Sequence, residues 1–397
     1  MTKGTIGILT GGGDVPGLNP AIRAITIRAL REGYRVLGIR RGWAGLVDMV
    51  PDPGTDNSAS IQELSENVVN RAGRTGGTFL HTSRTRPSHL PRAVVPEHLR
   101  DQYAEELNDA TPAVLKNLEF LGMDTLIAIG GDDTLSYAHR LHTEGVKVVA
   151  IPKTMDNDVP GTDYCIGFST CVTRTIELTH RLRTSAGSHE RFLVIEVFGR
   201  YAGFTALLPT MAGAADRCVI PEYEFDIDHL TELMTYDRNR HPSKYSVVLV
   251  SEGAVMRGQQ EMHFEDHEKD QYGHKKLGGI GDRIAAAVKD RSARFNNGQR
   301  INVVNQRLGY LVRSGDPDAM DSIVPMAFGN LALDLVLAGK SGRLVSVRNG
   351  AYDNVPIDVV VGRKKSVDVH RHYNTERLRP IYHSFSRQPV FIMTSDV

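Results

Sequence analysis

The sequence lacks the features that mark secreted, disulfide-rich or nucleic-acid-binding proteins. Among its 397 residues are only three cysteines, Cys165, Cys171 and Cys218, with no Cys-x-x-Cys spacing. Neither a disulfide framework nor a zinc site is indicated, and three ordinary, partly buried thiols in a reducing compartment account for them. Lys plus Arg and Asp plus Glu each number 47. The resulting net charge of zero gives no global electrostatic reason to bind nucleic acid or an anionic membrane.

Long apolar runs are also missing. The longest, such as residues 126–129 and 148–151, have the length of a strand, whereas a membrane helix needs roughly 18 apolar residues. The N-terminal residues reach three glycines too soon for the apolar region of a signal peptide. We therefore expect a soluble, cytoplasmic protein. No repeat, low-complexity tract or linker rich in Pro, Gly or Ser is present.

The residues that are present predict a large folded α/β protein. Hydrophobic residues make up 41% and charged residues 24%, close to the globular average, and the length allows one large fold or two lobes. Stretches of helical spacing, such as 20–31 and 111–121, separate short apolar runs in the rhythm of βαβ units. Five runs predict buried parallel strands: 5–10, 126–129, 148–151, 192–197 and 246–250. Ligands of such sheets bind at the carboxyl ends of the strands, so we expect the polar clusters there along one edge.

Glycine-rich and acidic clusters follow the first two runs. Residues 11–19 read GGGDVPGLN, and backbone N–H groups before a helix are suited to binding phosphate. The segment matches neither GxGxxG nor a P-loop, so a tight turn is the alternative. In GGDDT, residues 130–134, Asp132 and Asp133 are adjacent carboxylates. They are suited to Mg²⁺ bound together with substrate phosphates, and a helix N-cap is the alternative.

Further charged groups follow the third and fourth runs. Lys153, Asp156 and Asp158 lie within six residues. A carboxylate there is suited to accepting the proton of an attacking hydroxyl, while a lysine neutralises charge on a transferred phosphoryl group. A turn rich in Asn and Asp is the alternative. Arg200, in FGRYAG at 198–203, and Arg191 are suited to a sugar phosphate or to surface ion pairs.

The remaining polar segments are less specific. Glu252, after the fifth run, is suited to accepting hydrogen bonds from sugar hydroxyls, or it is simply solvated. Residues 253–276 are charged and poor in aromatics, which predicts an exposed helix end and loop, either a lid or a plain connection. The basic stretch that starts at Gly362 predicts a solvated face or a subunit contact.

Together these segments resemble the phosphofructokinase superfamily, from the first strand to about residue 330. The matching motifs, in chain order, are GGDVPGLN, GGTFLHTSR, GGDD, KTMDND, SHER, FGRYAG, SEG and YLVR. The resemblance implies two Rossmann-like lobes with mainly parallel sheets and an active site in the cleft between them. It further implies a phosphoryl-donor lobe of residues 1–165 plus 312–345, a sugar-phosphate lobe of residues 166–311, and a C-terminal extension, residues 346–397, packed on the lobes or on a neighbouring subunit.

The resemblance also implies roles for individual residues. By position, Asp156 is the base that takes the proton from the 1-hydroxyl of fructose 6-phosphate, and Asp132 is the Mg²⁺ ligand. Gly13 gives a backbone donor to the phosphoryl donor, with Gly12 beside it, and Arg84 bridges the two substrates. The sugar phosphate is held by Thr154, Asp156, Arg191, Phe198, Gly199, Arg200, Glu252, Tyr310 and Arg313. Arg191 reaches it from a neighbouring subunit, which implies a homodimer or homotetramer.

Two positions decide the expected phosphoryl donor. ATP-using members of the superfamily have glycine where this chain has Asp133 and Lys153. A carboxylate at 133 takes the place of the nucleotide's α-phosphate, and like charges about 4 Å apart at an effective dielectric near 20 repel by roughly 4 kcal/mol, on the order of a thousandfold in affinity. Lys153 is suited to stabilising the phosphate that leaves pyrophosphate. We therefore expect pyrophosphate as donor, a reversible reaction, and Asp133, Lys153 and Asp156 as catalytic residues.

Some positions depart from the superfamily pattern. Val304 stands where an arginine is usual, so one phosphate contact is missing or is supplied by Arg307. Ser314 and Gly315 replace a Gly-Gly pair. Sedoheptulose 7-phosphate is therefore a conceivable further acceptor, and we expect weak or absent allosteric control. The alternatives in function are an ATP-dependent phosphofructokinase, a member of the lipid and NAD kinase group, and a non-catalytic phosphometabolite-binding regulator.

Overall fold

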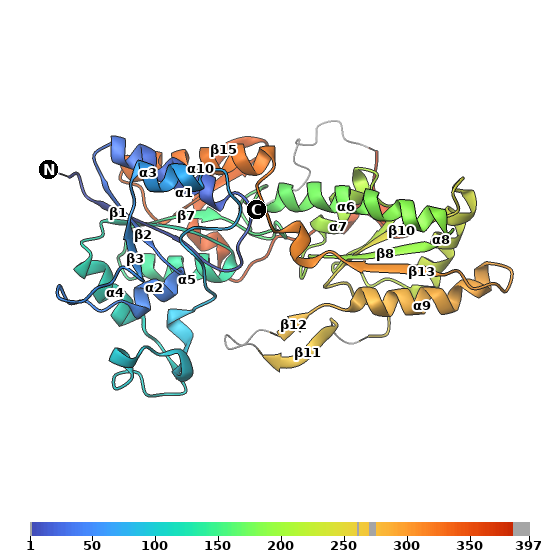
Figure 1. Ribbon diagram of the computed structural model, residues 1–397, viewed down its shortest axis with the longest axis horizontal. Helices are drawn as coiled ribbons and strands as arrows, with labels where there is room; N and C mark the ends of the chain where they lie inside the picture. The colour runs from blue at the N-terminus through green and yellow to red at the C-terminus, as the bar shows by residue number, and fades with distance from the viewer. Residues whose placement is uncertain (1, 260–261, 270–274, 384–397) are drawn as a thin grey trace.

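Two sheets flanked by helices make up the structure (Figure 1). This computed structural model describes residues 2–259, 262–269 and 275–383. The larger sheet has seven strands in the order β15-β14-β7-β6-β1-β2-β3, and the smaller has four in the order β13-β8-β10-β9. The expected α/β architecture with mainly parallel sheets is confirmed.

The larger sheet contains three of the expected strands. Its strands are β1 (Thr5–Thr10), β2 (Arg35–Ile39), β3 (Ile61–Glu63), β6 (Thr125–Gly130), β7 (Val148–Pro152), β14 (Arg343–Arg348) and β15 (Ala351–Pro356). The edge strand β3 pairs antiparallel with β2, and the other edge strand, β15, pairs antiparallel with β14. The remaining pairs in this sheet are parallel. Every residue of β1, β6 and β7 is buried, which explains their unbroken apolar runs.

The smaller sheet contains the other two expected strands. It is formed by β8 (Phe192–Val197), β9 (Arg217–Val219), β10 (Ser246–Ser251) and β13 (Val303–Arg307), all paired in parallel. Because the five expected strands belong to two sheets, the prediction of a single edge carrying all the polar clusters is wrong. The clusters lie instead on two sheets and line one cleft between them.

Helices cover both faces of each sheet (Figure 1). On the larger sheet, α1 (Leu18–Arg31), α3 (Glu66–Ala72) and α10 (Ala319–Leu337) pack on one face, and α2 (Trp43–Asp48), α4 (Thr111–Phe120) and α5 (Asp132–Thr143) on the other. On the smaller sheet, α6 (Phe168–Ser188) and α7 (Phe204–Met211) pack together, and α8 (Ile227–Arg240) packs on α9 (Ile280–Phe295). A short α11 (Val369–His372) and five one-turn 3₁₀ helices complete the described helices.

Two expected helices are confirmed with small shifts at their ends. The helix expected over 20–31 begins two residues earlier, at Leu18, after Gly17. The helix expected over 111–121 ends at Phe120, before Gly122, whose φ of +58° suits a helix stop. All three cysteines are free and buried, as expected.

The described part of the charged segment 253–276 contains an antiparallel strand pair where we expected a helix end and loop. Strands β11 (Phe264–Lys269) and β12 (Lys275–Leu277) pair antiparallel, and residues 260–261 and 270–274 lie outside the described residues. Charge-rich composition does not separate an exposed strand from an exposed helix, because both put polar side chains into water. The remaining short pairs are β4 (Leu90–Pro91) with β5 (Leu107–Asn108) and β16 (Tyr373–Asn374) with β17 (Arg379–Pro380).

One helix among the described residues, α10, is long and apolar enough to cross a membrane by length and composition alone. It has a mean hydropathy of 1.4 over its window, although its apolar residues do not form a continuous run. Phe328 and Leu333 are fully buried, and the helix packs along α1 and against β7 and β14. These contacts are those of a core helix.

Candidate active site

A cleft of about 960 Å³ lies between the two sheets. The segments that follow β1, β6 and β7 form one side, which we call the large-sheet wall. The segments that follow β8, β10 and β13 form the other side, the small-sheet wall. In both walls these are the carboxyl ends of parallel strands, where α/β sheets bind ligands.

Most of the residues singled out in the sequence line this cleft. Those that do are Gly12, Gly13, Arg84, Asp132, Asp133, Lys153, Thr154, Asp156, Phe198, Arg200, Glu252, Tyr310 and Arg313. Gly199 does not line it: with φ at +123°, a Cβ there would lie 2.9 Å from the carbonyl oxygen of Ala202, so this glycine permits the bend between Phe198 and Arg200. Arg191 does not line it either, because it precedes β8 at the opposite end of that strand.

Lys153 is a buried cation in the large-sheet wall. Its side chain is 4% exposed, and its Nζ donates to the carbonyl oxygen of Gly13 at 2.7 Å. Burial, together with the cations of Arg313 and Arg84 and against the opposing effect of Asp14, lowers the pKa of Lys153 to about 8. At neutral pH most of this lysine carries its charge, close to the glycine-rich loop.

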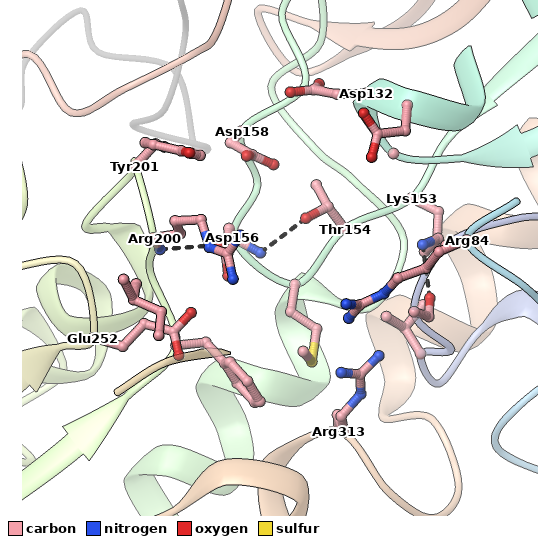
Figure 2. Close-up of a pocket in the computed structure, with 18 of the residues that line it drawn as sticks. Arg84, Asp132, Lys153, Thr154, Asp156, Asp158, Arg200, Tyr201, Glu252 and Arg313 are labelled. Atoms are coloured by element: carbon pink, nitrogen blue, oxygen red, sulfur yellow. Dashed lines mark hydrogen bonds between the residues drawn. The ribbon is translucent and has the colours of Figure 1, made fainter. Parts of the chain in front are cut away.

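Asp156 lies between Thr154 and the loop of Arg200 (Figure 2). Its Oδ2 accepts a hydrogen bond from the backbone N–H of Arg200 at 3.2 Å, and its own N–H donates to Thr154 Oγ1 at 3.2 Å. Burial and the neighbouring Asp158 raise the pKa of Asp156, and Arg200 acts in the opposite direction. A carboxyl group whose pKa is raised in this way gains and loses its proton closer to neutral pH, which suits a general base.

The loop around Asp156 is built by a buried turn residue. Asn157 has φ of +55° and is fully buried, and its Oδ1 accepts from the N–H of Cys165 at 2.8 Å. The turn that the sequence offered as the alternative for this segment is therefore present, and it is centred on Asn157. It brings its neighbours Asp156 and Asp158 both into the cleft.

Glu252 lies in the small-sheet wall, close enough to Asp156 for the two charges to interact. Burial raises its pKa to about 8, with the charge of Asp156 adding to the shift and Arg200 opposing it. Glu252 therefore carries a proton at neutral pH, so that it is able to donate a hydrogen bond as well as accept one. Glu252 is half-buried in the cleft wall, which does not fit a carboxylate on an open, solvated surface.

Asp132 and Asp133 are the first two residues of α5. The N-cap of this helix is Gly131, without a side-chain cap, so the capping alternative for the two carboxylates is not realised. Burial raises the pKa of Asp132 to about 7, and the charges of Asp158 and Asp133 add to the shift while Lys364 opposes it. Its Oδ2 lies 3.6 Å from Lys364 Nζ, and its buried Oδ1 has no hydrogen-bond partner.

The chemistry of Asp132 fits Mg²⁺. A buried carboxylate oxygen without a partner is able to bind a hard cation. No group of three or more His, Cys, Asp or Glu suited to a metal occurs within the described residues. Mg²⁺ commonly takes one or two carboxylates and completes its shell with water and substrate phosphates, so one inner carboxylate is sufficient here.

Asp133 forms an ion pair with Arg86, and both side chains are about half exposed. Arg86 lines the cleft, and no sequence signal singled it out. Its guanidinium compensates part of the negative charge that we expected at position 133. The estimate of roughly 4 kcal/mol for repulsion of a nucleotide is therefore too high, because it treats that carboxylate as unpaired.

Arg313 spans the cleft from the small-sheet side to the glycine-rich loop. Its Nη2 donates to the carbonyl oxygen of Asp14 at 2.7 Å and lies 3.3 Å from the Asp14 carboxylate. The guanidinium also lies over the rings of Phe198 and Tyr310, at 5.9 and 5.4 Å from their centroids. A Cβ on Gly13 would lie 2.2 Å from Arg313 Nη2, which explains glycine at this position.

Several cleft residues were given no role from the sequence. Glu196 lines the small-sheet wall with Arg307 beside it at 3.0 Å, and Tyr201, whose FGRYAG motif was noted without a role for this residue, lines the same wall. Lys364 enters from the basic stretch that we expected to be a solvated face or a subunit contact, and the next residue, Lys365, is 2% exposed. The solvated-face reading is thus wrong for the buried Lys365, whereas Lys364 is exposed at the cleft. The only signal in the sequence was that the two lysines are adjacent, which does not predict that this segment reaches the cleft.

The comparisons with known proteins agree with the fold. The phosphofructokinase family model matches residues 5–336. The chain is 37% identical over 372 residues to pyrophosphate--fructose 6-phosphate 1-phosphotransferase of Dictyoglomus thermophilum, covering 93% of this chain and 96% of the relative. It is 34% identical over 372 residues to ATP-dependent 6-phosphofructokinase 3 of Streptomyces coelicolor, covering 94% and 98%.

The crystal structure of a pyrophosphate-dependent phosphofructokinase from Marinobacter aquaeolei superimposes with a TM-score of 0.72 at 17% identity, over 95% of this chain and 88% of that one. At this identity the likeness concerns the fold alone. Together with the family match over most of the chain, it leads to one assignment: the protein is a phosphotransferase that belongs to the phosphofructokinase family.

Proposed function

We propose that the enzyme transfers a phosphoryl group from inorganic pyrophosphate to the 1-hydroxyl of fructose 6-phosphate, reversibly, giving fructose 1,6-bisphosphate and phosphate. The observation that carries the proposal is the pair Asp133 and Lys153 in the large-sheet wall, beside the glycine-rich loop. Relatives of nearly equal identity are named for either donor, so overall similarity does not decide between pyrophosphate and ATP. Asp133 and Lys153 support pyrophosphate as the donor.

Asp133 excludes the nucleotide mainly by the volume that it fills. Its carboxylate and the guanidinium of Arg86 together take space that glycine at 133 would leave open, and the remaining negative charge opposes a third phosphate. Pyrophosphate is shorter and needs no such space. Buried Lys153, held toward the loop by Gly13, offers a cation to the phosphate that leaves.

Asp156 acts as the general base in this proposal. Its raised pKa keeps a fraction of the carboxyl protonated near neutrality, so it takes the proton of the 1-hydroxyl in one direction and returns it in the other. Thr154 and the backbone of Arg200 hold the carboxyl in place. Bound Mg²⁺, held through Asp132, would neutralise negative charge on the transferred group.

The small-sheet wall binds the sugar phosphate in this proposal. Arg200, Glu252 and Arg313, with Phe198 and Tyr310, line that side, and Arg84, which also lines the cleft, would bridge the two substrates. Arg307 also lines the cleft and is suited to the contact that Val304 does not make. Arg191 does not reach the cleft of its own chain, so we propose that it acts in a neighbouring subunit of a homodimer or homotetramer.

The domain division follows from the same assignment. We propose residues 1–165 plus 312–345 as the phosphoryl-donor lobe, residues 166–311 as the sugar-phosphate lobe, and 346–397 as an extension, of which 384–397 lie outside the described residues. In the structure β15 (Ala351–Pro356), from the extension, pairs with β14 of the larger sheet. A cytoplasmic location and weak allosteric control remain predictions.

Transfer of labelled phosphate tests the function. The enzyme is incubated with Mg²⁺, fructose 6-phosphate and ³²P-labelled pyrophosphate, and the products are separated by chromatography. We expect label in fructose 1,6-bisphosphate and in free phosphate in equal amounts, and label returning to pyrophosphate when the products are supplied. Label in free phosphate alone would contradict the proposal. Sedoheptulose 7-phosphate in place of fructose 6-phosphate measures the breadth of the acceptor site.

A further inference from the structure

The C-terminal part of the chain contributes a cation to the cleft. Lys364 lines the cleft, although it lies beyond the family-matched residues and in a stretch that showed no motif. Its Nζ is 3.6 Å from Asp132 Oδ2 and 3.6 Å from the centroid of the Tyr201 ring. Asp132 belongs to the large-sheet wall and Tyr201 to the small-sheet wall, so Lys364 connects the two sides.

The neighbouring residues hold this lysine in place. The N–H of Lys365 donates to the carbonyl oxygen of Asp158 at 2.9 Å, and its buried Nζ donates to that of Thr162 at 2.7 Å. Two residues later, the N–H of Val367 donates to Glu222 Oε1 at 2.7 Å. Lys365 and Val367 therefore fix the backbone, while the Lys364 side chain, 44% exposed, remains open to the cleft.

The charges around Lys364 point to an anion as its partner during the reaction. Its ammonium lies against Asp132, the carboxylate that would hold Mg²⁺. A metal ion held by Asp132 would offset the negative charge that attracts Lys364. The ammonium, kept at the cleft by the Tyr201 ring, would then present its three donors to the cleft, the proposed site of pyrophosphate.

We propose that Lys364 is a donor-binding residue that contacts a phosphate of pyrophosphate, held in position by Asp132 until the metal and pyrophosphate bind. The inference rests on the proposed function. It gives the C-terminal extension a direct part in donor recognition, in addition to Lys153 and Arg84. Because the structural contacts of the segment belong to Lys365 and Val367, replacing Lys364 leaves the fold intact.

Calorimetric titration with methylenediphosphonate, a pyrophosphate analogue that is not cleaved, tests this role without turnover. The variants are Lys364→Met and, as a matched control, Arg363→Met, whose exposed side chain lines a separate cavity with Gly161 and Arg348. In the presence of Mg²⁺ we expect Lys364→Met to bind the diphosphonate about tenfold or more weakly, since charge-assisted hydrogen bonds contribute about 1.5–3 kcal/mol. Fructose 6-phosphate binding and the melting temperature should stay at the wild-type values, and Arg363→Met should match the wild type throughout.

The outcomes separate this inference from the proposed function. If the wild type binds the diphosphonate and Lys364→Met binds it equally well, the role of Lys364 is refuted while the function stands. If the variant loses affinity for both the diphosphonate and fructose 6-phosphate, or melts at a lower temperature, its part is structural and the inference is overturned. If the wild type itself does not bind the diphosphonate, the proposed donor is wrong.

Discussion

The guanidinium of Arg86 pairs with the carboxylate of Asp133, and both residues line the cleft. This contact bears on the donor selection that we propose. An unpaired carboxylate would repel a nucleotide by charge, whereas a paired one excludes it chiefly by occupying space. In the function that we propose, donor choice would therefore depend on the size of the side chain at 133 as well as on its charge.

Replacing the two donor-side residues should shift the enzyme toward ATP. In Asp133→Gly combined with Lys153→Gly, the space for a third phosphate opens and the cation opposite the leaving phosphate is lost. We expect kcat/KM with pyrophosphate to fall by about 100-fold or more and ATP-dependent turnover to appear or rise. Steady-state kinetics with each donor measures both. A variant that keeps the wild-type preference would show that these residues do not select the donor.

Removing the proposed base should slow turnover with little change in substrate binding. Asp156→Ser takes away the proton acceptor but leaves Thr154 and Arg200 in the cleft. We expect kcat to drop roughly 100- to 10,000-fold in both directions. The KM for fructose 6-phosphate should change much less. Full turnover in this variant would remove Asp156 from the mechanism.

The dependence of kcat/KM on pH should show the titration of Asp156 as a rise at lower pH and that of Lys153 as a fall at higher pH. In the direction of fructose 1,6-bisphosphate synthesis the base must be ionised, so kcat/KM rises as pH increases through the raised pKa of Asp156. The pKa of Lys153 is about 8, so its cation is present below that pH and is lost above it, and the rate falls. In Lys153→Arg, whose guanidinium does not deprotonate, the falling limb near pH 8 should disappear. A falling limb that persists there would assign it to another group.

A methyl group on the glycine-rich loop should disturb substrate binding. In Gly13→Ala the new Cβ would meet Arg313 Nη2 at 2.2 Å, so the guanidinium must move away from Asp14. We expect kcat/KM for fructose 6-phosphate to fall about tenfold, or roughly 1.4 kcal/mol, because the guanidinium can give way to the methyl group only by leaving its place beside Asp14. Gly54→Ala, where a Cβ would meet only the side chain of Asp52, is the matched control and should keep wild-type kinetics. Equal kinetics of the two variants would argue against the Arg313 contact.

The strand ends that carry the chemistry were predictable from sequence. Buried parallel strands such as β6 and β7 are continuous apolar runs, and the polar residues after them, Asp132 and Lys153, had to lie at the carboxyl edge. Their grouping into two sheets was not predictable from apolar runs alone. That grouping depends on pairing between segments far apart in the chain, such as β8 with β13.

The ion-pair partners of Asp133 and Asp132 come from distant segments of the chain and could not be predicted from local sequence patterns. Arg86 and Lys364 complete the surroundings of Asp133 and Asp132, yet each lies in a segment whose composition is that of an ordinary surface. Their placement follows from the path of the backbone, which for Lys364 is fixed by the buried Lys365. The local composition of a segment does not predict where in the fold the backbone places it.

The most direct test of the central claim is a comparison of initial rates with the two donors. Purified enzyme is assayed with fructose 6-phosphate and Mg²⁺, with pyrophosphate or ATP varied over the same range. We predict a kcat/KM for pyrophosphate at least about 100-fold above that for ATP, which corresponds to roughly 2.7 kcal/mol of discrimination. An equal or higher kcat/KM with ATP would contradict the account.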